Sequence, residues 1–275
     1  MITKTIGQVT FDLNEDFDCS FIAEYGEPFA VFDQQDSGNL CFGVIGANGK
    51  LFLKTAGAAT VRSHYTQEEA VERLKANADI YTDLRHPKLT KLLEHRAINS
   101  GYLLVFEWFN GECMGNQYTS RDKFLCLPQA GKLDIYQDVL AFHQHVNDKD
   151  YIAIDFYDGS IMYDFTTHES MICDVELYQK KPVVNSIGRM PGSSRYMSPE
   201  EFELGAVIDE RSNVFCMGAA AFDLFGGGKD RSFEKWSLSE PLYKVAMKAV
   251  STDKQDRYYS IGAYMEAWTD TDDYK

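Results

Sequence analysis

Several common features are missing from this sequence of 275 residues. Its six cysteines form no C-x-x-C pair, and no histidine lies at zinc-ligand spacing from any of them, which argues against structural zinc. No apolar run reaches the roughly 18 residues that cross a bilayer, and residues 1–16 lack the apolar core of a signal peptide. Internal repeats and low-complexity segments are also missing. From these absences we expect a cytoplasmic protein with reduced thiols.

Positive charge is scarce as well. The chain carries 27 Lys and Arg against 42 Asp and Glu, which gives a formal net charge of −15. A surface this acidic repels phosphate backbones and anionic lipids, so we expect neither a nucleic-acid nor a membrane partner. Hydrophobic residues make up 44% and charged residues 25%, which is ordinary for a globular protein with a substantial core.

The first part of the chain has mainly β patterns. Residues 40–56 contain two apolar runs separated by Asn48-Gly49, a strong hairpin signal. A helix is predicted next, because Thr66 is a good N-cap and Glu69 completes a capping box before a helical apolar stripe. Residues 89–95 and 101–109 predict two further strands. This part is therefore expected to be a sheet with one helix.

The pattern changes near Asn110-Gly111. Helical stripes follow from about residue 133, with two more near residues 214–225 and 242–249. Residues 151–178 predict short strands joined by acidic turns. The order predicts a β-rich part over residues 1–109 and an α-rich part over 110–275, with a ligand cleft at the break.

Two sets of residues carry possible chemistry. Alternation in the strand KLFLK places Phe52 and Lys54 on one face, although a lysine at a strand end is commonly only solvated. Asp155, Asp158 and Asp174 lie in two acidic loops. Clustered carboxylates need a cation or a raised pKa, and Mg²⁺ is usually held by one or two carboxylates together with substrate phosphates. Solvated turn acids are the alternative interpretation.

The order of these features resembles the eukaryotic-type Ser/Thr protein kinase domain. GSSRYMSPEEF at residues 192–202 resembles the G-T-x-x-Y-x-A-P-E segment, and residues 209–227 resemble the D-x-R-S-D-V-W-S-x-G helix. Arg257 matches the late arginine that pairs with the A-P-E glutamate, here Glu200, so we expect a buried ion pair. The resemblance covers roughly residues 25–268. It implies an α+β, two-lobed protein-kinase-like fold, with an N-lobe over 1–109 and a C-lobe over 110–275 forming one domain.

The resemblance also assigns catalytic roles. Lys54 matches the lysine that contacts the α and β phosphates of ATP. Asp155 matches the H-R-D aspartate, which orients the attacking hydroxyl and accepts its proton, and Asp174 matches the D-F-G aspartate that holds Mg²⁺. Ser160 stands at the position of a metal-binding asparagine, and Glu176 or Asp158 is expected to assist the metal in its place.

The nucleotide-binding positions implied by the resemblance lie in the N-lobe and at its end. Gly38 is the central glycine of a phosphate-covering loop, and the backbone at Glu107 and Phe109 falls on the hinge that meets adenine. Phe52 replaces a small alanine and is expected to narrow the adenine site. Phe106 falls on the gatekeeper position.

The remaining departures from the family pattern concern charge. The glycine loop is flanked by Asp33 and Asp36, which would repel phosphate unless a cation intervenes. Asn77 replaces the glutamate that pairs with the lysine, and Asn213 replaces an aspartate that braces the catalytic loop. Because Ile154 replaces the H-R-D arginine, we expect no need for phosphorylation between residues 174 and 200.

Three functions follow as alternatives. The first is an ATP- and Mg²⁺-dependent phosphotransferase acting on a protein Ser or Thr, favoured by the retained Lys54, Asp155 and Asp174. The second is a pseudokinase that acts as a binding or scaffold module with a protein partner, favoured by the departures. The third is a small-molecule phosphotransferase of the aminoglycoside- or choline-kinase type, in which an acidic residue such as Glu176 is common. Substrate, partner and oligomeric state are not determined by the sequence.

Overall fold

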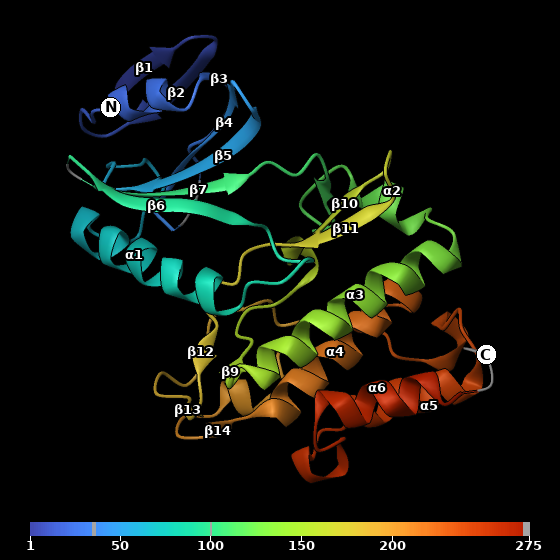
Figure 1. The fold of residues 1–275 in the computed structure, drawn as a ribbon. Coiled ribbons are helices and arrows are strands. Elements are labelled where there is room, and N and C mark those ends of the chain that lie inside the picture. The colour runs from blue at the N-terminus through green and yellow to red at the C-terminus, as the bar shows by residue number, and fades with distance from the viewer. Residues whose placement is uncertain (35–36, 100, 272–275) are drawn as a thin grey trace. The chain divides into compact units, whose positions relative to one another are not determined.

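The computed structural model of the chain describes residues 1–34, 37–99 and 101–271. It divides into two compact units, Met1–Phe109 and Asn110–Lys275 (Figure 1). Unit 1 is built around a five-stranded sheet and unit 2 is mainly helical. This mixed arrangement is compatible with a two-lobed kinase-like fold. Within the described ranges, no helix combines the length and the apolarity needed to cross a membrane.

An antiparallel sheet forms the centre of unit 1. Its strands lie in the spatial order β3, β4, β5, β7, β6, with the bounds Glu27–Phe32, Leu40–Gly46, Gly49–Ala56, Gly101–Glu107 and Leu92–Ile98. The predicted hairpin is present as β4 and β5. Its turn lies one residue earlier than predicted, because Gly49, with a φ of +124°, takes the last paired position opposite Gly46. Ala47 and Asn48 therefore make the turn.

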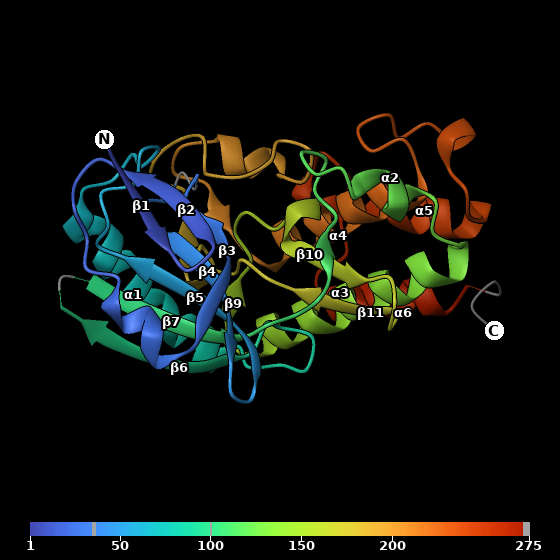
Figure 2. The same ribbon diagram turned by 90° about the horizontal axis from the view of Figure 1, so that it is seen from above.

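Different elements pack on the two faces of this sheet. A hairpin of β1 (Ile2–Ile6) and β2 (Val9–Leu13), followed by the short helix η1 (Ser20–Glu24), packs on one face (Figure 2). The fully buried core lies there, and its sheet residues alternate along the strands as a half-buried strand requires: Leu40, Phe42, Val44, Leu53, Leu103 and Val105. The opposite face carries Phe52 and Lys54, as the alternation predicted.

Helix α1 (Gln67–Asp83) covers part of that second face. The predicted capping box is present: the Thr66 hydroxyl accepts from the Glu69 N–H at 3.2 Å, and the Glu69 carboxylate accepts from the Thr66 N–H at 2.9 Å. The ring of Tyr81 on α1 meets Phe106 of β7 edge to face, with the ring centroids 4.8 Å apart. The helix is therefore fixed to the sheet at its C-terminal end.

Helix α4 (Glu210–Phe225) is buried along nearly its whole length in unit 2. Three other helices pack against it: α3 (Gln129–Asp148), α5 (Glu240–Ala249) and α6 (Ile261–Thr269). A Cβ at Gly218 would lie 2.7 Å from the Ala249 Cβ, so this glycine lets α4 and α5 approach closely. The predicted stripes correspond to α3, α4 and α5, whereas α6 and the short α2 (Arg121–Leu125) were not predicted.

Small β elements in unit 2 support the acidic loops. Three short strands form a sheet in the order β11 (Glu169–Ile172), β10 (Ile161–Asp164) and β8 (Glu112–Cys113). Two separate pairs complete the set: β9 (Tyr151–Ile152) with β12 (Gln179–Lys180), and β13 (Val183–Val184) with β14 (Val207–Ile208). The short helices η2 (Asp158–Ser160) and η3 (Pro199–Phe202) lie between them in sequence.

The predicted ion pair in unit 2 is confirmed. Both guanidinium nitrogens Nη1 and Nη2 of Arg257 donate to the Glu200 carboxylate, at 2.7 and 3.0 Å. The Ser212 hydroxyl donates to the same carboxylate at 2.6 Å. The Arg257 side chain is fully buried, so both charges are satisfied inside the protein.

Candidate functional site

Two predicted site carboxylates of unit 2 lie at turns with an unusual backbone. Asp155 follows β9 and has a φ of +61°, and Asp174 follows β11 and has a φ of +60°. A positive φ is uncommon outside glycine and costs conformational energy, so such turns persist where the surrounding structure holds them. These turns set the position of both carboxylates.

Two side chains of α4 hold the Asp155 turn in place. In the amide orientation that satisfies both groups, Asn213 donates to the Ala153 carbonyl and accepts from the Ala153 N–H, each at 3.1 Å. The Cys216 thiol donates to the carbonyl of Phe156 at 3.5 Å. Asn213 therefore braces this loop through an amide rather than through a carboxylate.

Asp155 and Asp174 influence each other electrostatically. Burial raises the pKa of Asp155 to about 6, and the charge of Asp174 contributes to the same rise. A hydrogen bond from the Ser193 N–H and the charge of Arg189 act in the opposite direction. Asp174 itself is solvent-exposed. The carboxylates therefore repel each other, as expected for groups that share a cation site.

Tyr157 is a residue of this site that the sequence did not reveal. Burial raises its pKa, and the charges of Asp174 and Asp155 raise it further. Its ring lies directly over Gly159, where a Cβ would approach the ring to 2.4 Å. The phenol therefore stays protonated beside the two carboxylates and can act as a hydrogen-bond donor.

Ser160 lies beside the Asp174 turn, because its carbonyl accepts from the Cys173 N–H at 2.9 Å. The side chain of Ser160 is fully buried, and its hydroxyl oxygen has no hydrogen-bond partner among the described residues. A buried polar atom of this kind is rare in proteins and implies a missing partner such as water or an ion. It is the observation in unit 2 that best fits a bound cation or its water.

Few side chains near the Asp174 turn could bind a metal ion. In the part of the chain that the structure describes, no three His, Cys, Asp or Glu side chains come together as a metal site. A magnesium ion fits such a set, since it is typically bound by one or two carboxylates and completes its shell with water and phosphate oxygens. Asp174, with Glu176 two residues later, would hold it beside the Ser160 hydroxyl. Their roles in metal binding stay a prediction.

Asp158 has a different role from the one expected. Its carboxylate is fully buried and accepts from Arg195 Nη2 at 2.6 Å. The backbone N–H groups of Asn116 and Gly159 donate to it at 3.2 and 3.1 Å. Because its oxygens are used by these donors, we no longer assign Asp158 to the metal.

In unit 1, Lys54 lies in the middle of the sheet. It pairs with Cys41 of β4 on one side and with Leu104 of β7 on the other. The side chain of Asn77 on α1, which the resemblance places opposite this lysine, is buried. The sheet therefore presents Lys54 on the face that α1 partly covers, as the resemblance implies; its contact with phosphate stays a prediction.

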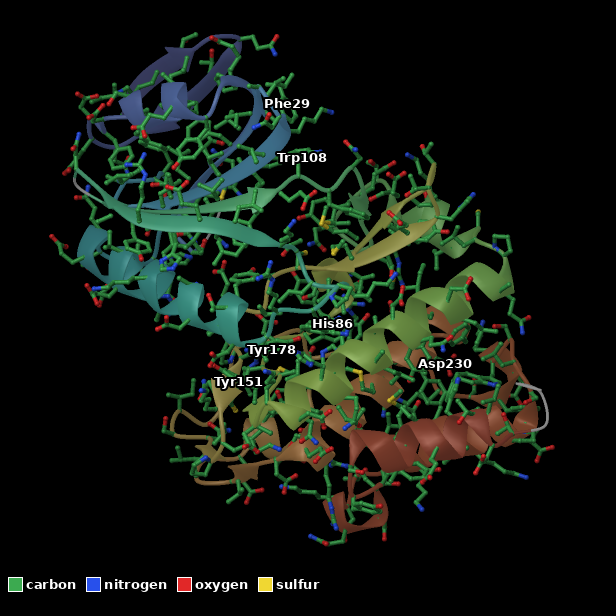
Figure 3. The ribbon with its side chains drawn as sticks, in the orientation of Figure 1. Phe29, His86, Trp108, Tyr151, Tyr178 and Asp230 are labelled. Carbon is green, nitrogen blue, oxygen red and sulfur yellow. The ribbon has the colours of Figure 1, made fainter. Side chains whose placement is uncertain are left out.

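Aromatic rings fill the neighbouring part of that face. The ring centroid of Phe52 lies 5.9 Å from that of Phe32, 6.2 Å from that of Phe106 and 6.3 Å from that of Trp108. Phe29 meets Trp108 edge to face at 4.9 Å (Figure 3). We call Phe29, Phe32, Phe52, Phe106 and Trp108 the aromatic cluster. Phe52 is thus one member of a larger packed group.

Gly43 shows how tight the aromatic cluster is. It lies opposite Phe52 in the ladder, and a Cβ there would approach the rings of Phe29 and Trp108 to 2.7 and 2.8 Å. Only glycine leaves room for these rings to cross β4. The sequence analysis named Phe52 and Phe106 but not their packing, because ring contacts between different strands cannot be read from spacing.

The predicted phosphate loop is only partly described, since Asp36 lies outside the described residues. One carboxylate oxygen of Asp33 accepts from the Asp12 N–H of β2 at 3.2 Å, and the effect of Asp33 on phosphate stays a prediction. Gly38 is buried with a φ of +76°, and a Cβ there would meet the Ser63 hydroxyl at 2.6 Å. An internal contact thus already requires this glycine, and its approach to phosphate stays a prediction.

At the end of β7, backbone donors are partly used within unit 1. The N–H of Glu107 donates to the Lys91 carbonyl at 3.0 Å, and the N–H of Trp108 donates to the Lys50 carbonyl at 3.3 Å. The Glu107 carboxylate forms an exposed ion pair with Lys91 at 3.1 Å. Phe109 is the last residue of the unit. Adenine recognition by Glu107 and Phe109 stays a prediction.

Comparison with known proteins reveals a distant similarity. The chain resembles the serine/threonine-protein kinase pkn2 of Myxococcus xanthus, with 21% identity over 206 residues. That alignment covers 72% of this chain and 24% of the kinase, so the chain spans about a quarter of the length of that relative. No protein-family model matches the chain. The similarity supports a kinase-like relationship for most of the sequence.

Proposed function

We propose that the chain is an ATP- and Mg²⁺-dependent phosphotransferase that acts on a Ser or Thr hydroxyl of a protein. The observation that carries this proposal is the pair of carboxylates in unit 2. Asp155 and Asp174 sit on strained turns and repel each other, and the Asp174 turn is joined through the Cys173 N–H to Ser160, whose buried hydroxyl has no partner among the described residues. Perturbed carboxylates in such an arrangement are typical of sites that handle protons and cations.

The chemistry assigns one role to each group. The acceptor hydroxyl oxygen attacks the γ-phosphorus of ATP, the bond from that phosphorus to the β–γ bridging oxygen breaks, and ADP leaves. The hydroxyl proton passes to the Asp155 carboxylate, which is available above its pKa of about 6. Bound Mg²⁺ supplies neutralising charge for the phosphates. Asp174 and Glu176 hold the ion, and Lys54 is the lysine that the resemblance assigns to the phosphates.

Calorimetry of nucleotide binding tests the proposal. We expect ATP to bind much more tightly with Mg²⁺ than with EDTA, and we expect Asp174→Ala to remove this difference. Asp155→Asn should leave binding nearly intact and abolish transfer to peptide, because its role is with the hydroxyl. Asp150→Asn is a matched control, since Asp150 also has a positive φ of +59° but is exposed and lies before β9. Equal binding with EDTA and Mg²⁺ would contradict the metal-assisted site.

The aromatic cluster favours a second function, a kinase-like binding module without transfer. Its rings occupy the face of the sheet that the resemblance assigns to the adenine roof, and they pack against each other there. On this alternative, Phe52→Ala should create room and strengthen ATP binding. Phe32→Ala, which removes an exposed ring of the same cluster, serves as the control. Transfer by the wild type to a peptide would exclude this alternative.

The third alternative differs from the first in the molecule that accepts the phosphoryl group. A small-molecule phosphotransferase would transfer to a free hydroxylated compound and not to a peptide. Its support is Glu176 and the missing H-R-D context around Asp155, and an assay that offers both a peptide and free hydroxylated compounds as acceptors decides between the two.

A further inference from the structure

The segment that contacts Asp155 is anchored by a partly buried ring of charges in unit 2. Arg195 Nη2 lies 2.6 Å from Asp158 Oδ1, and its Nη1 lies 3.3 Å from Asp223 Oδ1. Arg121 completes the ring, with Nη2 at 2.8 Å from Asp223 Oδ2 and Nη1 at 3.8 Å from Asp158 Oδ2. Two arginines and two aspartates alternate, so the ring has no net charge.

The four members come from four different parts of the unit. Arg121 belongs to α2, Asp158 to η2 and Asp223 to α4, while Arg195 lies in the segment 192–196 between β13 and η3. The two aspartates are 0% and 9% exposed, and Arg195 is 23% exposed. The Asp158 carboxylate is the fully buried member, so breaking its pair with Arg195 would leave a buried charge without its closest cation, and this cost keeps Arg195 in place.

The same segment lies against Asp155. A Cβ at Gly192 would lie 3.5 Å from Asp155 Oδ1, so this glycine borders the carboxylate. The N–H of the next residue, Ser193, faces the same carboxylate and lowers its pKa. Ser193 and Arg195 share one turn, since the Tyr196 N–H donates to the Ser193 carbonyl at 2.9 Å. The guanidinium of Arg195 also lies over the Tyr196 ring, 5.0 Å from its centroid. A residue held at position 195 therefore fixes the direction of the N–H at position 193.

We infer that Arg195 is a positioning residue, which keeps the Ser193 N–H on the Asp155 carboxylate through its ion pairs with Asp158 and Asp223. The inference deepens the proposed function and rests on it for its consequence in catalysis. A segment held by an internal arginine needs no added phosphate to hold it. The ring thus supplies a physical reason for the expectation that no phosphorylation between residues 174 and 200 is required.

Hydrogen exchange at the Ser193 amide tests the inference without any need for activity. In Arg195→Gln we expect exchange of this amide to be at least tenfold faster, while the amides of α3 keep their wild-type rates. Arg195→Lys keeps the charge, but an ammonium group cannot bridge both aspartates as the planar guanidinium does. This variant is expected to fold and to show the same faster exchange of the Ser193 amide. Unchanged exchange at Ser193 in either folded variant would overturn the inference.

Two variants serve as controls. Arg121→Gln removes an arginine from the same ring but not from the segment, so it should lower the melting temperature and leave Ser193 exchange unchanged. Lys229→Gln removes an exposed hydrogen bond to Ser194, at 3.1 Å, and should change neither property. If Arg121→Gln accelerates exchange at Ser193 as much as Arg195→Gln does, the ring is merely structural and the positioning role is wrong.

Activity supplies the second measurement. If the chain transfers phosphate, Arg195→Lys should lower kcat at least tenfold and leave the KM for ATP within twofold. The reason is that the substitution affects Asp155, which accepts the proton of the acceptor hydroxyl, and not the residues that bind ATP. An unchanged kcat would overturn the catalytic consequence. If neither the wild type nor any variant transfers phosphate, the proposed function fails, and the exchange measurement still decides whether Arg195 positions Ser193.

Discussion

At the scale of single residues, the Asp155 carboxylate is held where its charge is unfavourable. Its pKa is raised from 3.8 to about 6 by burial and by Asp174. At pH values between 3.8 and about 6, Asp155 therefore holds its proton in the folded protein and has lost it in the unfolded chain. This contribution to stability is therefore largest at low pH and is lost as the pH rises through about 6.

Replacing this carboxylate should stabilise the protein. We expect Asp155→Asn to raise the free energy of unfolding at pH 7 by roughly 1 to 2 kcal/mol, after allowance for partial exposure. At pH 4 the wild-type carboxyl is mostly neutral and the difference should nearly vanish. Urea denaturation of both proteins at the two pH values measures this. An Asn variant that is less stable at pH 7 would show that Asp155 supports the fold rather than the chemistry.

The Glu200–Arg257 pair is the opposite case, since each charge is fully matched. Removal of one partner leaves the other buried alone, so Arg257→Ala should cost about 3 to 5 kcal/mol of stability. Lys244→Ala is a suitable control, because Lys244 forms an ion pair with Glu240 on an exposed helix face. That variant should cost less than about 0.5 kcal/mol. Equal melting temperatures for the two variants would refute the structural role of the buried pair.

At the scale of elements, the capping box of α1 makes a measurable contribution to the stability of the protein. Thr66→Ala removes the acceptor for the Glu69 N–H and should cost about 1 kcal/mol. Thr82→Ala makes the same substitution at an exposed position near the C-terminal end of this helix. It should be neutral or slightly stabilising, because alanine has the higher helix propensity. Chemical denaturation of the two variants compares them directly.

Elements with a strong local signal were predictable. The hairpin β4–β5, helix α1 with its cap and the three helices with clear apolar stripes follow from nearest-neighbour chemistry in the sequence. Helix α6 was missed because Tyr264 and Trp268 pack in the interior of unit 2 and the segment is short. The turn of the hairpin shifted by one residue because the positive φ of Gly49 fits the end of the ladder.

The site was predictable only where the resemblance named a residue. Asp155 and Asp174 were assigned from their order in the chain, whereas Tyr157 and Arg195 carried no signal of their own. Arg195 acts through partners 28 and 37 residues away in sequence, and such pairings depend on the folded chain. The same reason explains why Asp158 was assigned to a metal: an arginine partner 37 residues away cannot be read from local sequence.

At the scale of the whole molecule, acidity and buried titratable groups together set the pH dependence of stability. Burial raises the pKa of Glu201 from 4.5 to about 7, so its contribution to stability is lost as the pH rises through about 7. The net charge of −15 adds self-repulsion at high pH. Burial lowers the pKa of His143 from 6.5 to about 4, so its contribution is present above 6.5 and is lost as the pH falls toward 4.

With Asp155, whose contribution is lost between about pH 4 and 6, these contributions predict that the protein is most stable between about pH 4 and 5. The melting temperature should fall on both sides, and added salt should raise it at pH 8, where the self-repulsion of the acidic surface is strongest. Glu201→Gln should reduce the fall between pH 6 and 8, because a neutral amide still accepts the hydrogen bonds that Ser198 donates at 2.6 and 2.8 Å. Scanning calorimetry from pH 4 to 9 measures both proteins. A melting temperature that rises steadily from pH 5 to 8 would mean that Glu201 is ionised in the folded protein, with a cationic partner that compensates its burial.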